Sequence, residues 1–224
     1  MPKNFAVARA NMINGQIITV GVTDRRLIAT LSVIPRERFV PAGMTRLAYM
    51  DADVLIKEST RTSPARYLMA AGPFARLVQE ANISREDIVL DVGCATGYSS
   101  AVFAQLANSV IALESDEGLA GLAAETLVDI GVDNVAVVTG PLADGWSDAG
   151  PYDVIFIGGS IDDVPTVLTD QLSFGGRLVG IIGRGHSASG TVFIKSRSAV
   201  GVRRFLNAAV PTLPGFKRPK AFVF

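Results

Sequence analysis

Short apolar runs alternate with amphipathic segments along the chain from about residue 87 onward. Runs of this kind, separated by helical periodicity, are typical of parallel strands buried on both faces of a sheet. We expect five such strands, at 88–92, 110–113, 135–138, 154–157 and 178–182. The segments between them predict helices at 97–107, 117–130 and 164–172. Two further strands, 191–195 and 201–206, are expected to lie antiparallel at one edge.

The first 80 residues have a different pattern, which predicts helices with breaks. Asp24 is a plausible N-cap for a helix over 25–31, whose leucines and isoleucine share one face. Ser63-Pro64 predicts the start of another helix, because proline is favoured at the first helical position. Gly72-Pro73 is expected to kink or restart that helix, which then runs to about residue 80. The expected fold is therefore a doubly wound, mostly parallel α/β domain (81–224) with a helical N-terminal extension (1–80).

Composition restricts the class of protein. The chain has 224 residues, of which 49% are hydrophobic and 19% charged, so it can bury a core of its own without disulfides. Cys94 is the single cysteine. No apolar run approaches the roughly 18 residues of a membrane span, and Arg9, Asn11 and Asn14 interrupt the apolar region that a secretory signal needs. We therefore expect a cytoplasmic protein without a membrane partner.

The formal net charge of zero conceals a segregation of charge along the chain. Residues 1–80 hold 11 Lys+Arg against 6 Asp+Glu, residues 81–190 hold 3 against 15, and residues 191–224 hold 7 against none. An acidic centre argues against a general nucleic-acid surface. It suits a fold that holds a cation, between basic segments that meet an anion, although solvated faces alone would give the same pattern.

The most informative turn follows the first expected strand and has the form Asp-x-Gly-x-Ala-x-Gly over 91–97. A dinucleotide fingerprint fits poorly, because Ala95 and Tyr98 stand where its second and third glycines belong. A phosphate loop is excluded, because no Gly-Lys-Ser/Thr is present. An acid before a turn of small residues suits S-adenosylmethionine, which carries a sulfonium, an ammonium and a carboxylate.

Each end of that ligand has a candidate partner. Asp91 would face the cationic end, and the helix N-terminus at Gly97 would meet the carboxylate. Glu114 ends the second expected strand, 23 residues after Asp91, and is placed to accept hydrogen bonds from both ribose hydroxyls. The competing interpretation is an ordinary strand–helix turn followed by a surface glutamate.

At this point the sequence resembles the protein-L-isoaspartate O-methyltransferase family, over about residues 21–183. Four stretches carry the resemblance: 21–24 with the Ile-Pro-Arg-Glu-Arg-Phe-Val-Pro segment at 34–41; the cofactor loop 89–98; 134–146; and 152–179. The segment at 34–41 is the most specific of them, because it lies outside the cofactor fold.

The resemblance implies a Rossmann-like class I methyltransferase fold, with the N-terminal extension contributing to the substrate side. It also implies transfer of a methyl group from S-adenosylmethionine to the free α-carboxylate of L-isoaspartyl residues, in peptides or proteins. Carried over onto this sequence, the cofactor-binding positions are Asp91, Gly93, Cys94, Ala95, Gly97, Tyr98, Glu114, Ser115, Pro141, Leu142 and Gly158. No metal is expected, because no His/Cys/Asp cluster has ligand spacing.

The sequence departs from the family on the substrate side. The family carries Gly-Gln-Thr-Ile-Ser-x-Pro there, and its serine touches the substrate. Alignment on Phe74-Ala75-Arg76 places Met69 at the serine, and methionine cannot donate a strong hydrogen bond. A shifted alignment offers Thr62 or Ser63, although Ser63 before a proline is equally explained as a helix N-cap.

A second departure follows the third strand, where the family has Gly-Asp-Gly with the acid near the adenine. Here Pro141 offers no acceptor, while Leu142 is able to pack on the ring and Asp144 is a possible substitute for the acid. After the fourth strand, Gly158-Gly159-Ser160 keeps small residues, and Ser160 is a minor candidate for a substrate contact. Two alternatives therefore stay open: a methyltransferase with another carboxylate or small-molecule acceptor, and a cofactor-binding protein that has lost isoaspartyl methylation.

Overall fold

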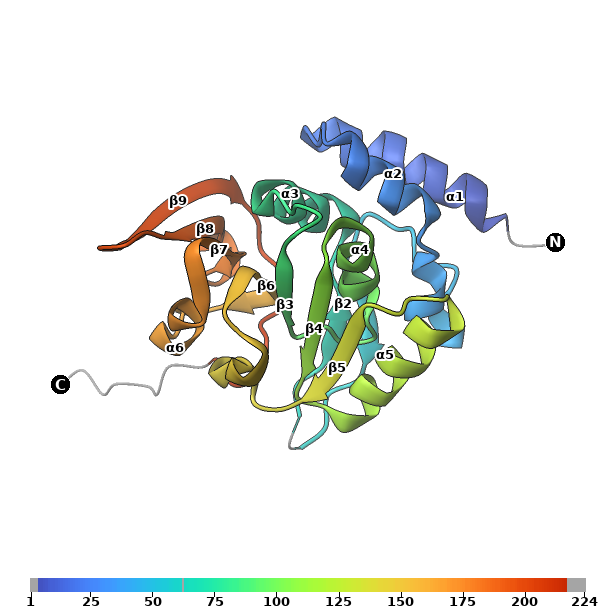
Figure 1. Cartoon of the computed structure of the whole chain (residues 1–224). Helices are drawn as coiled ribbons and strands as arrows, with labels where there is room; N and C mark the ends of the chain where they lie inside the picture. The colour runs from blue at the N-terminus through green and yellow to red at the C-terminus, as the bar shows by residue number, and fades with distance from the viewer. Residues whose placement is uncertain (1–3, 62, 217–224) are drawn as a thin grey trace.

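The structure is a computed structural model that describes residues 4–61 and 63–216. Its centre is a seven-stranded sheet in the order β5-β4-β3-β6-β7-β8-β9 (Figure 1). The strands are β3 (Ile88–Val92), β4 (Ser109–Glu114), β5 (Val135–Thr139), β6 (Tyr152–Ile161), β7 (Leu172–Ile182), β8 (Ser189–Lys195) and β9 (Val200–Asn207). The first five pair in parallel, whereas β8 and β9 add antiparallel at one edge. The expected doubly wound fold is confirmed.

The boundaries around the fourth and fifth strands were predicted wrongly. β6 continues through its two glycines to Ile161, and β7 begins at Leu172. Leu172 pairs with Tyr152 of β6, so the chain enters the sheet where the sequence predicted a helix. The helix expected over 164–172 is therefore reduced to α6 (Thr166–Asp170).

Three helices, α3 (Ala71–Ala81), α4 (Tyr98–Leu106) and α5 (Glu117–Asp129), pack on one face of the sheet, where their buried side chains belong to a single core cluster. Shorter segments cover the other face, where Leu142, Leu168 and Leu213 belong to a second cluster. α3 packs against β7 and β8, whereas α4 and α5 pack against β4 and β5. Asp116 caps α5 by accepting a hydrogen bond of 3.1 Å from the backbone N–H of Leu119. This arrangement explains the continuous apolar strands, because each strand has side chains to bury on both sides.

The N-terminal segment forms α1 (Phe5–Met12), which continues as a π-helical stretch, and α2 (Arg25–Val33). Asp24 caps α2 as predicted: its carboxylate accepts hydrogen bonds from the backbone N–H groups of Arg26 (2.8 Å) and Leu27 (3.1 Å). Arg26 also donates to the carbonyl of Leu106 at the end of α4, at 2.9 Å. Shorter 3-10 turns lie at Ile18–Val20, Arg36–Phe39, Ala42–Met44, Leu142–Asp144, Ser147–Ala149 and Gly185–Ser187.

The helix predicted to begin at Ser63-Pro64 is absent from the described residues there, and this prediction is wrong. A two-stranded antiparallel sheet takes its place, formed by β1 (Val54–Lys57) and β2 (Arg66–Leu68). Ser63 lies in the connecting turn, where its carbonyl accepts from the N–H of Thr60 at 2.8 Å, so it is not an N-cap. Pro73 is the third residue of α3, where its missing N–H leaves no helical hydrogen bond unmade.

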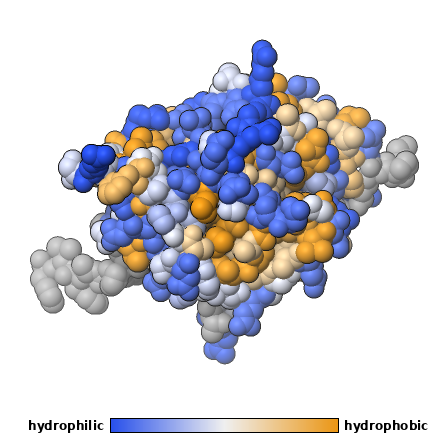
Figure 2. Space-filling view, viewed as in Figure 1, coloured by the Kyte–Doolittle hydropathy of each residue, from blue (hydrophilic) through white to orange (hydrophobic). Residues whose placement is uncertain are grey.

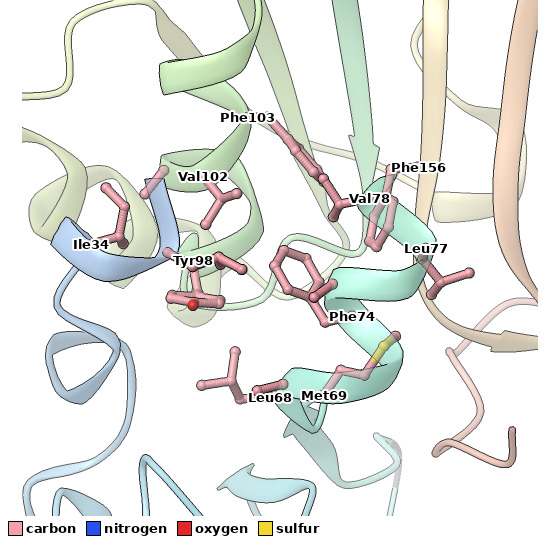
Figure 3. Close-up of a cluster of buried hydrophobic side chains, with 14 of the residues drawn as sticks. Ile34, Leu68, Met69, Phe74, Leu77, Val78, Tyr98, Val102, Phe103 and Phe156 are labelled. Carbon is pink, nitrogen blue, oxygen red and sulfur yellow. The ribbon is translucent and has the colours of Figure 1, made fainter. Parts of the chain in front are cut away.

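The buried core joins the N-terminal segment to the sheet. Figure 3 shows aromatic side chains from α3, α4 and β6 gathered in one cluster with Leu68 and Met69 beside it, namely Phe74, Tyr98, Phe103 and Phe156. Ring centroids lie 5.0 Å apart for Phe103–Phe156, 5.5 Å for Phe74–Tyr98 and 5.7 Å for Phe74–Phe156. Edge-to-face and tilted contacts of this kind fix the position of α3 and of the strand before it.

The surface is mixed in character. Figure 2 shows one face on which hydrophilic residues surround a smaller hydrophobic area. Across residues 4–61 and 63–216, no helix is long and apolar enough to cross a membrane.

Candidate functional site

The strand order reverses beside β3. The chain runs from β3 to β4 and β5 on one side, then returns to place β6 on the other side of β3. Ligands of doubly wound sheets bind at such a switch point, beyond the carboxyl ends of the strands. Gly93 follows β3 and Gly158 lies in β6, and a Cβ on Gly158 would lie 2.7 Å from the carbonyl oxygen of Gly93. The two strands therefore approach each other more closely than any side chain at Gly158 would allow.

The turn after β3 depends on left-handed backbone. Gly93 has φ +82° and Gly97 has φ +91°, and the non-glycine Ala95 has φ +54°. A Cβ at Gly97 would lie 3.2 Å from the Cβ of Ala123 in α5. Cys94 is buried inside the turn, and burial raises the pKa of its thiol, so it fills space as a neutral group.

Asp91 lies near the end of β3 and is fully buried. Its Oδ2 accepts hydrogen bonds from the hydroxyls of Ser99 and Ser100, both at 2.6 Å. Its Oδ1 has no hydrogen-bond partner within the described part of the chain. Burial raises the pKa of Asp91 to about 6. An unpartnered carboxylate oxygen here is suited to a cationic group that enters beside the turn.

Glu114 ends β4 and is fully buried, so it is not the surface glutamate of the competing interpretation. The backbone N–H of Ala95 donates to its Oε2 at 2.9 Å. The N–H groups of Ser115 and Asp116 donate to its Oε1 at 2.8 and 3.1 Å. This carboxylate is therefore held by the turn after β3 and by the turn after its own strand.

Sequence reasoning missed the main partner of Glu114, which is Arg66 of β2. The Nη1 of Arg66 lies 2.5 Å from Oε1 of Glu114, and the Nη2 lies 2.7 Å from Oε2. Both side chains are buried, at 4% and 0% exposure. A signal was present in the arginine itself, since it falls in an otherwise apolar segment beside Met69. The periodicity alone could not show which acid it meets.

Met69 lies at this edge of the sheet. Two adjoining cavities share Met69, Tyr67 and Gly158 among their lining residues. One of them is also lined by Arg66 and the other by Gly93. Met69, which aligns with the family's serine, therefore lies at the switch point but carries a thioether instead of a hydroxyl.

Tyr98 opens α4 and packs in the core. Its ring lies 5.6 Å from that of Phe39 and 4.8 Å from the guanidinium carbon of Arg36. Burial raises the pKa of its hydroxyl. The ring therefore anchors the N-terminal segment against the cofactor turn.

The remaining candidates are more scattered. Ser160 is buried, and its hydroxyl lies 3.2 Å from that of Thr212, so the chain's own C-terminal segment holds it. Ser63 lies in the β1–β2 turn, and Thr62 lies outside the described residues. Pro141 and Asp144 are exposed after β5, whereas Leu142 is buried. Ser115 is exposed after β4.

The donor set fits S-adenosylmethionine. Asp91 has an unpartnered oxygen, Glu114 places a carboxylate at the end of the neighbouring strand, and glycines at 93 and 158 allow close approach. The helix α4 begins directly after Gly97 and turns its free N–H groups toward the same edge. Within the described residues, no group of three or more His, Cys, Asp or Glu side chains forms a metal site.

Comparisons with known proteins show the family to which the chain is similar. A sequence model described as protein-L-isoaspartate(D-aspartate) O-methyltransferase matches residues 8–208. A protein-L-isoaspartate O-methyltransferase of Opitutus terrae is 36% identical over 187 residues, 84% of this chain and 76% of that protein. Protein-L-isoaspartate O-methyltransferase 1 of Rhodopseudomonas palustris is 34% identical over 200 residues, 89% of this chain and 79% of its own.

Solved structures show the same fold. A structure titled protein-L-isoaspartate O-methyltransferase superposes with a TM-score of 0.80 at 22% identity, covering 93% of this chain and 67% of its own. A Plasmodium falciparum structure, described as a protein of that name in complex with S-adenosyl-L-homocysteine, has a TM-score of 0.75 at 18% identity. It covers 95% of this chain and 99% of its own.

Proposed function

Because the chain belongs to the protein-L-isoaspartate(D-aspartate) O-methyltransferase family, we propose that it transfers a methyl group from S-adenosylmethionine to the α-carboxylate of L-isoaspartyl residues in peptides and proteins. The observation that carries the proposal is the pair of buried carboxylates, Asp91 and Glu114, at the ends of the neighbouring strands β3 and β4, beside the switch point. Two carboxylates in these places suit the ammonium and the ribose hydroxyls of S-adenosylmethionine.

S-adenosylmethionine supplies an electrophilic methyl group on a sulfonium. On the protein side, Glu114 would accept hydrogen bonds from the ribose hydroxyls, and the unpartnered oxygen of Asp91 would accept from the ammonium. The N–H groups at the start of α4 would hold the cofactor's carboxylate. The lining of one cavity includes the neighbouring positions Gly93, Cys94, Ala95, Tyr98 and Gly158. The other expected positions follow the next strands, with Ser115 after β4 and Pro141 and Leu142 after β5.

The acceptor needs little acid–base help, because a carboxylate is already a nucleophile. The protein's contribution is to orient that carboxylate and to exclude water. The N-terminal extension supplies the substrate side of the site through β2 and the start of α3, where Met69 lines both cavities. Ser63 and Ser160 are weaker candidates for substrate contacts. Ser63 lies in the turn between β1 and β2, and the hydroxyl of Ser160 forms a hydrogen bond with that of Thr212.

The decisive experiment is a methyl-transfer assay with radiolabelled S-adenosylmethionine. An isoaspartyl peptide is compared with its normal aspartyl twin, and calorimetry with S-adenosylhomocysteine measures cofactor affinity on the same sample. Label on the isoaspartyl peptide alone is the expected result. If the protein binds S-adenosylhomocysteine but transfers no methyl group to either peptide, the proposed acceptor is wrong and another carboxylate substrate is favoured.

A further inference from the structure

The Arg66–Glu114 ion pair uses the same two oxygens that the ribose hydroxyls need. Oε1 of Glu114 accepts from Arg66 Nη1, from two backbone N–H groups and, at 3.3 Å, from the hydroxyl of Ser115, and Oε2 accepts from Arg66 Nη2 and from the N–H of Ala95. Two oxygens offer about four acceptor sites in all. A diol therefore has no free acceptor on Glu114 unless an existing donor leaves. The backbone donors are fixed by their turns, whereas the Ser115 hydroxyl and the guanidinium are carried on rotatable side chains. Release of the hydroxyl frees part of Oε1 alone, whereas the guanidinium occupies both oxygens.

A guanidinium that leaves Glu114 needs another anion. Arg66 is 3% exposed, and a buried charge without a partner is strongly destabilising. Among the described residues that line the two cavities, Arg66 is the single charged side chain. An anion that enters these cavities therefore meets Arg66 before any other cation.

The proposed substrate brings such an anion. Its reactive group is a carboxylate, and an arginine fork binds carboxylates through two parallel hydrogen bonds. Met69, at the position of the family's serine, offers no donor of its own. Arg66 lies three residues earlier and lines the same cavity as Met69.

We propose that Arg66 exchanges partners during the reaction: it is paired with Glu114 in the free protein, yields that carboxylate to the ribose, and then binds the α-carboxylate of the isoaspartyl substrate. This inference rests on the proposed function and assigns the substrate-binding cation of that site. The fork holds both carboxylate oxygens, and each keeps a second lone pair. One of these lone pairs attacks the methyl carbon, so that an oxygen–carbon bond forms as the carbon–sulfur bond breaks and S-adenosylhomocysteine leaves. Cofactor binding thereby prepares the substrate site.

The two halves of the exchange predict opposite effects of one substitution, which calorimetry measures without turnover. Arg66→Gln removes the competitor for Glu114, so S-adenosylhomocysteine should bind about fivefold to tenfold more tightly than to the wild type. The same variant loses the guanidinium that would bind the substrate carboxylate. An isoaspartyl peptide should therefore bind the S-adenosylhomocysteine-bound variant at least about tenfold more weakly than it binds the wild type in the same state. A merely structural role for Arg66 would weaken both.

Arg177→Gln is the matched control. Arg177 also forms a partly buried ion pair, in which its Nη2 lies 2.5 Å from the carboxylate of Asp87. This pair lies beside the start of β3, away from the carboxyl ends of the strands where the site lies. This variant should lose stability and leave both affinities unchanged. Arg66→Lys keeps the charge without the fork, and should give intermediate affinities for both ligands while preserving the fold.

If the folded Arg66→Gln and Arg66→Lys variants bind S-adenosylhomocysteine more weakly than the wild type does, Arg66 does not compete with the cofactor for Glu114. Unchanged peptide affinity in these variants would overturn the assignment of the substrate carboxylate. If the wild type bound the isoaspartyl peptide no better than its aspartyl twin, the proposed function and the substrate assignment would both fail. In that case the affinities of the wild type and the Arg66 variants for S-adenosylhomocysteine would still decide whether Arg66 competes with the cofactor.

Discussion

Arg36, which is 1% exposed, donates a hydrogen bond of 2.6 Å from Nη2 to the backbone carbonyl of Met69. Its Nε donates to the carbonyl of Ala48 at 2.7 Å. The Pro-Arg-Glu-Arg segment, whose resemblance to the family is the most specific in the chain, thus holds the backbone at the edge of the cavities. The segment thereby fixes the backbone position of Met69.

Arg36→Met should lower the free energy of unfolding by about 2–4 kcal/mol, because it leaves two buried carbonyl groups without a donor. Urea unfolding measures the change. Arg38→Met is a matched control two residues away, since Arg38 forms an exposed pair with Asp129 at 51% and 63% side-chain exposure. The control should change stability by no more than about 0.5 kcal/mol. Equal losses for the two variants would contradict the structural role of Arg36.

Met69→Ser should raise kcat/KM for an isoaspartyl peptide, because it places a hydroxyl donor in the cavities that Met69 lines. It should also lower the free energy of unfolding by about 2–4 kcal/mol, since Met69 is 7% exposed and belongs to the core. Met69→Ala makes a similar cavity without the hydroxyl. Activity that rises equally in both variants would mean that added space, and not a hydrogen bond, is responsible.

Glu114→Gln should weaken S-adenosylhomocysteine binding by about 1–3 kcal/mol, through loss of charged hydrogen bonds to the ribose. It should also destabilise the protein by about 3–5 kcal/mol, because the guanidinium of Arg66 is left buried without its counter-charge. Calorimetry and urea unfolding measure the two effects separately. Glu117→Gln changes an exposed carboxylate three residues away and should affect neither. Undiminished affinity in folded Glu114→Gln would remove Glu114 from the ribose.

Asp91 makes stability depend on pH with a definite sign. Burial raises its pKa to about 6 in the folded protein, above the roughly 3.9 of an unfolded chain. Between these values the folded state holds the proton more tightly, so stability falls as pH rises. The loss due to Asp91 should be about 1 kcal/mol between about pH 5 and pH 7.

Asp91→Asn should remove that component, because asparagine has no proton to lose. Relative to the wild type, the variant should therefore gain about 1 kcal/mol in unfolding free energy between about pH 5 and pH 7. Parallel urea titrations at the two pH values give the difference directly. A difference that does not change with pH would show that Asp91 is ionised in both states throughout this range.

Several elements were predictable because their signals are local. The strand over 88–92 and the cap at Asp24 follow from residues within a few positions of each other, and both are confirmed. The helix predicted at Ser63-Pro64 failed because its signal was equally local, while the deciding contacts were not. Residues 66–68 pair with β1 and bury Arg66 against an acid in β4.

The sequence by itself determined the doubly wound fold, the glycine turn after Asp91 and the acid at Glu114, because spacing and residue type specify backbone shape and strand ends. Only the tertiary structure decided what those acids meet. The Arg66–Glu114 pair joins residues 48 positions apart, and the Arg36–Met69 bond joins residues 33 apart. No periodicity encodes such partners, since they depend on how separate elements pack, and packing brings together side chains that the chain itself keeps distant.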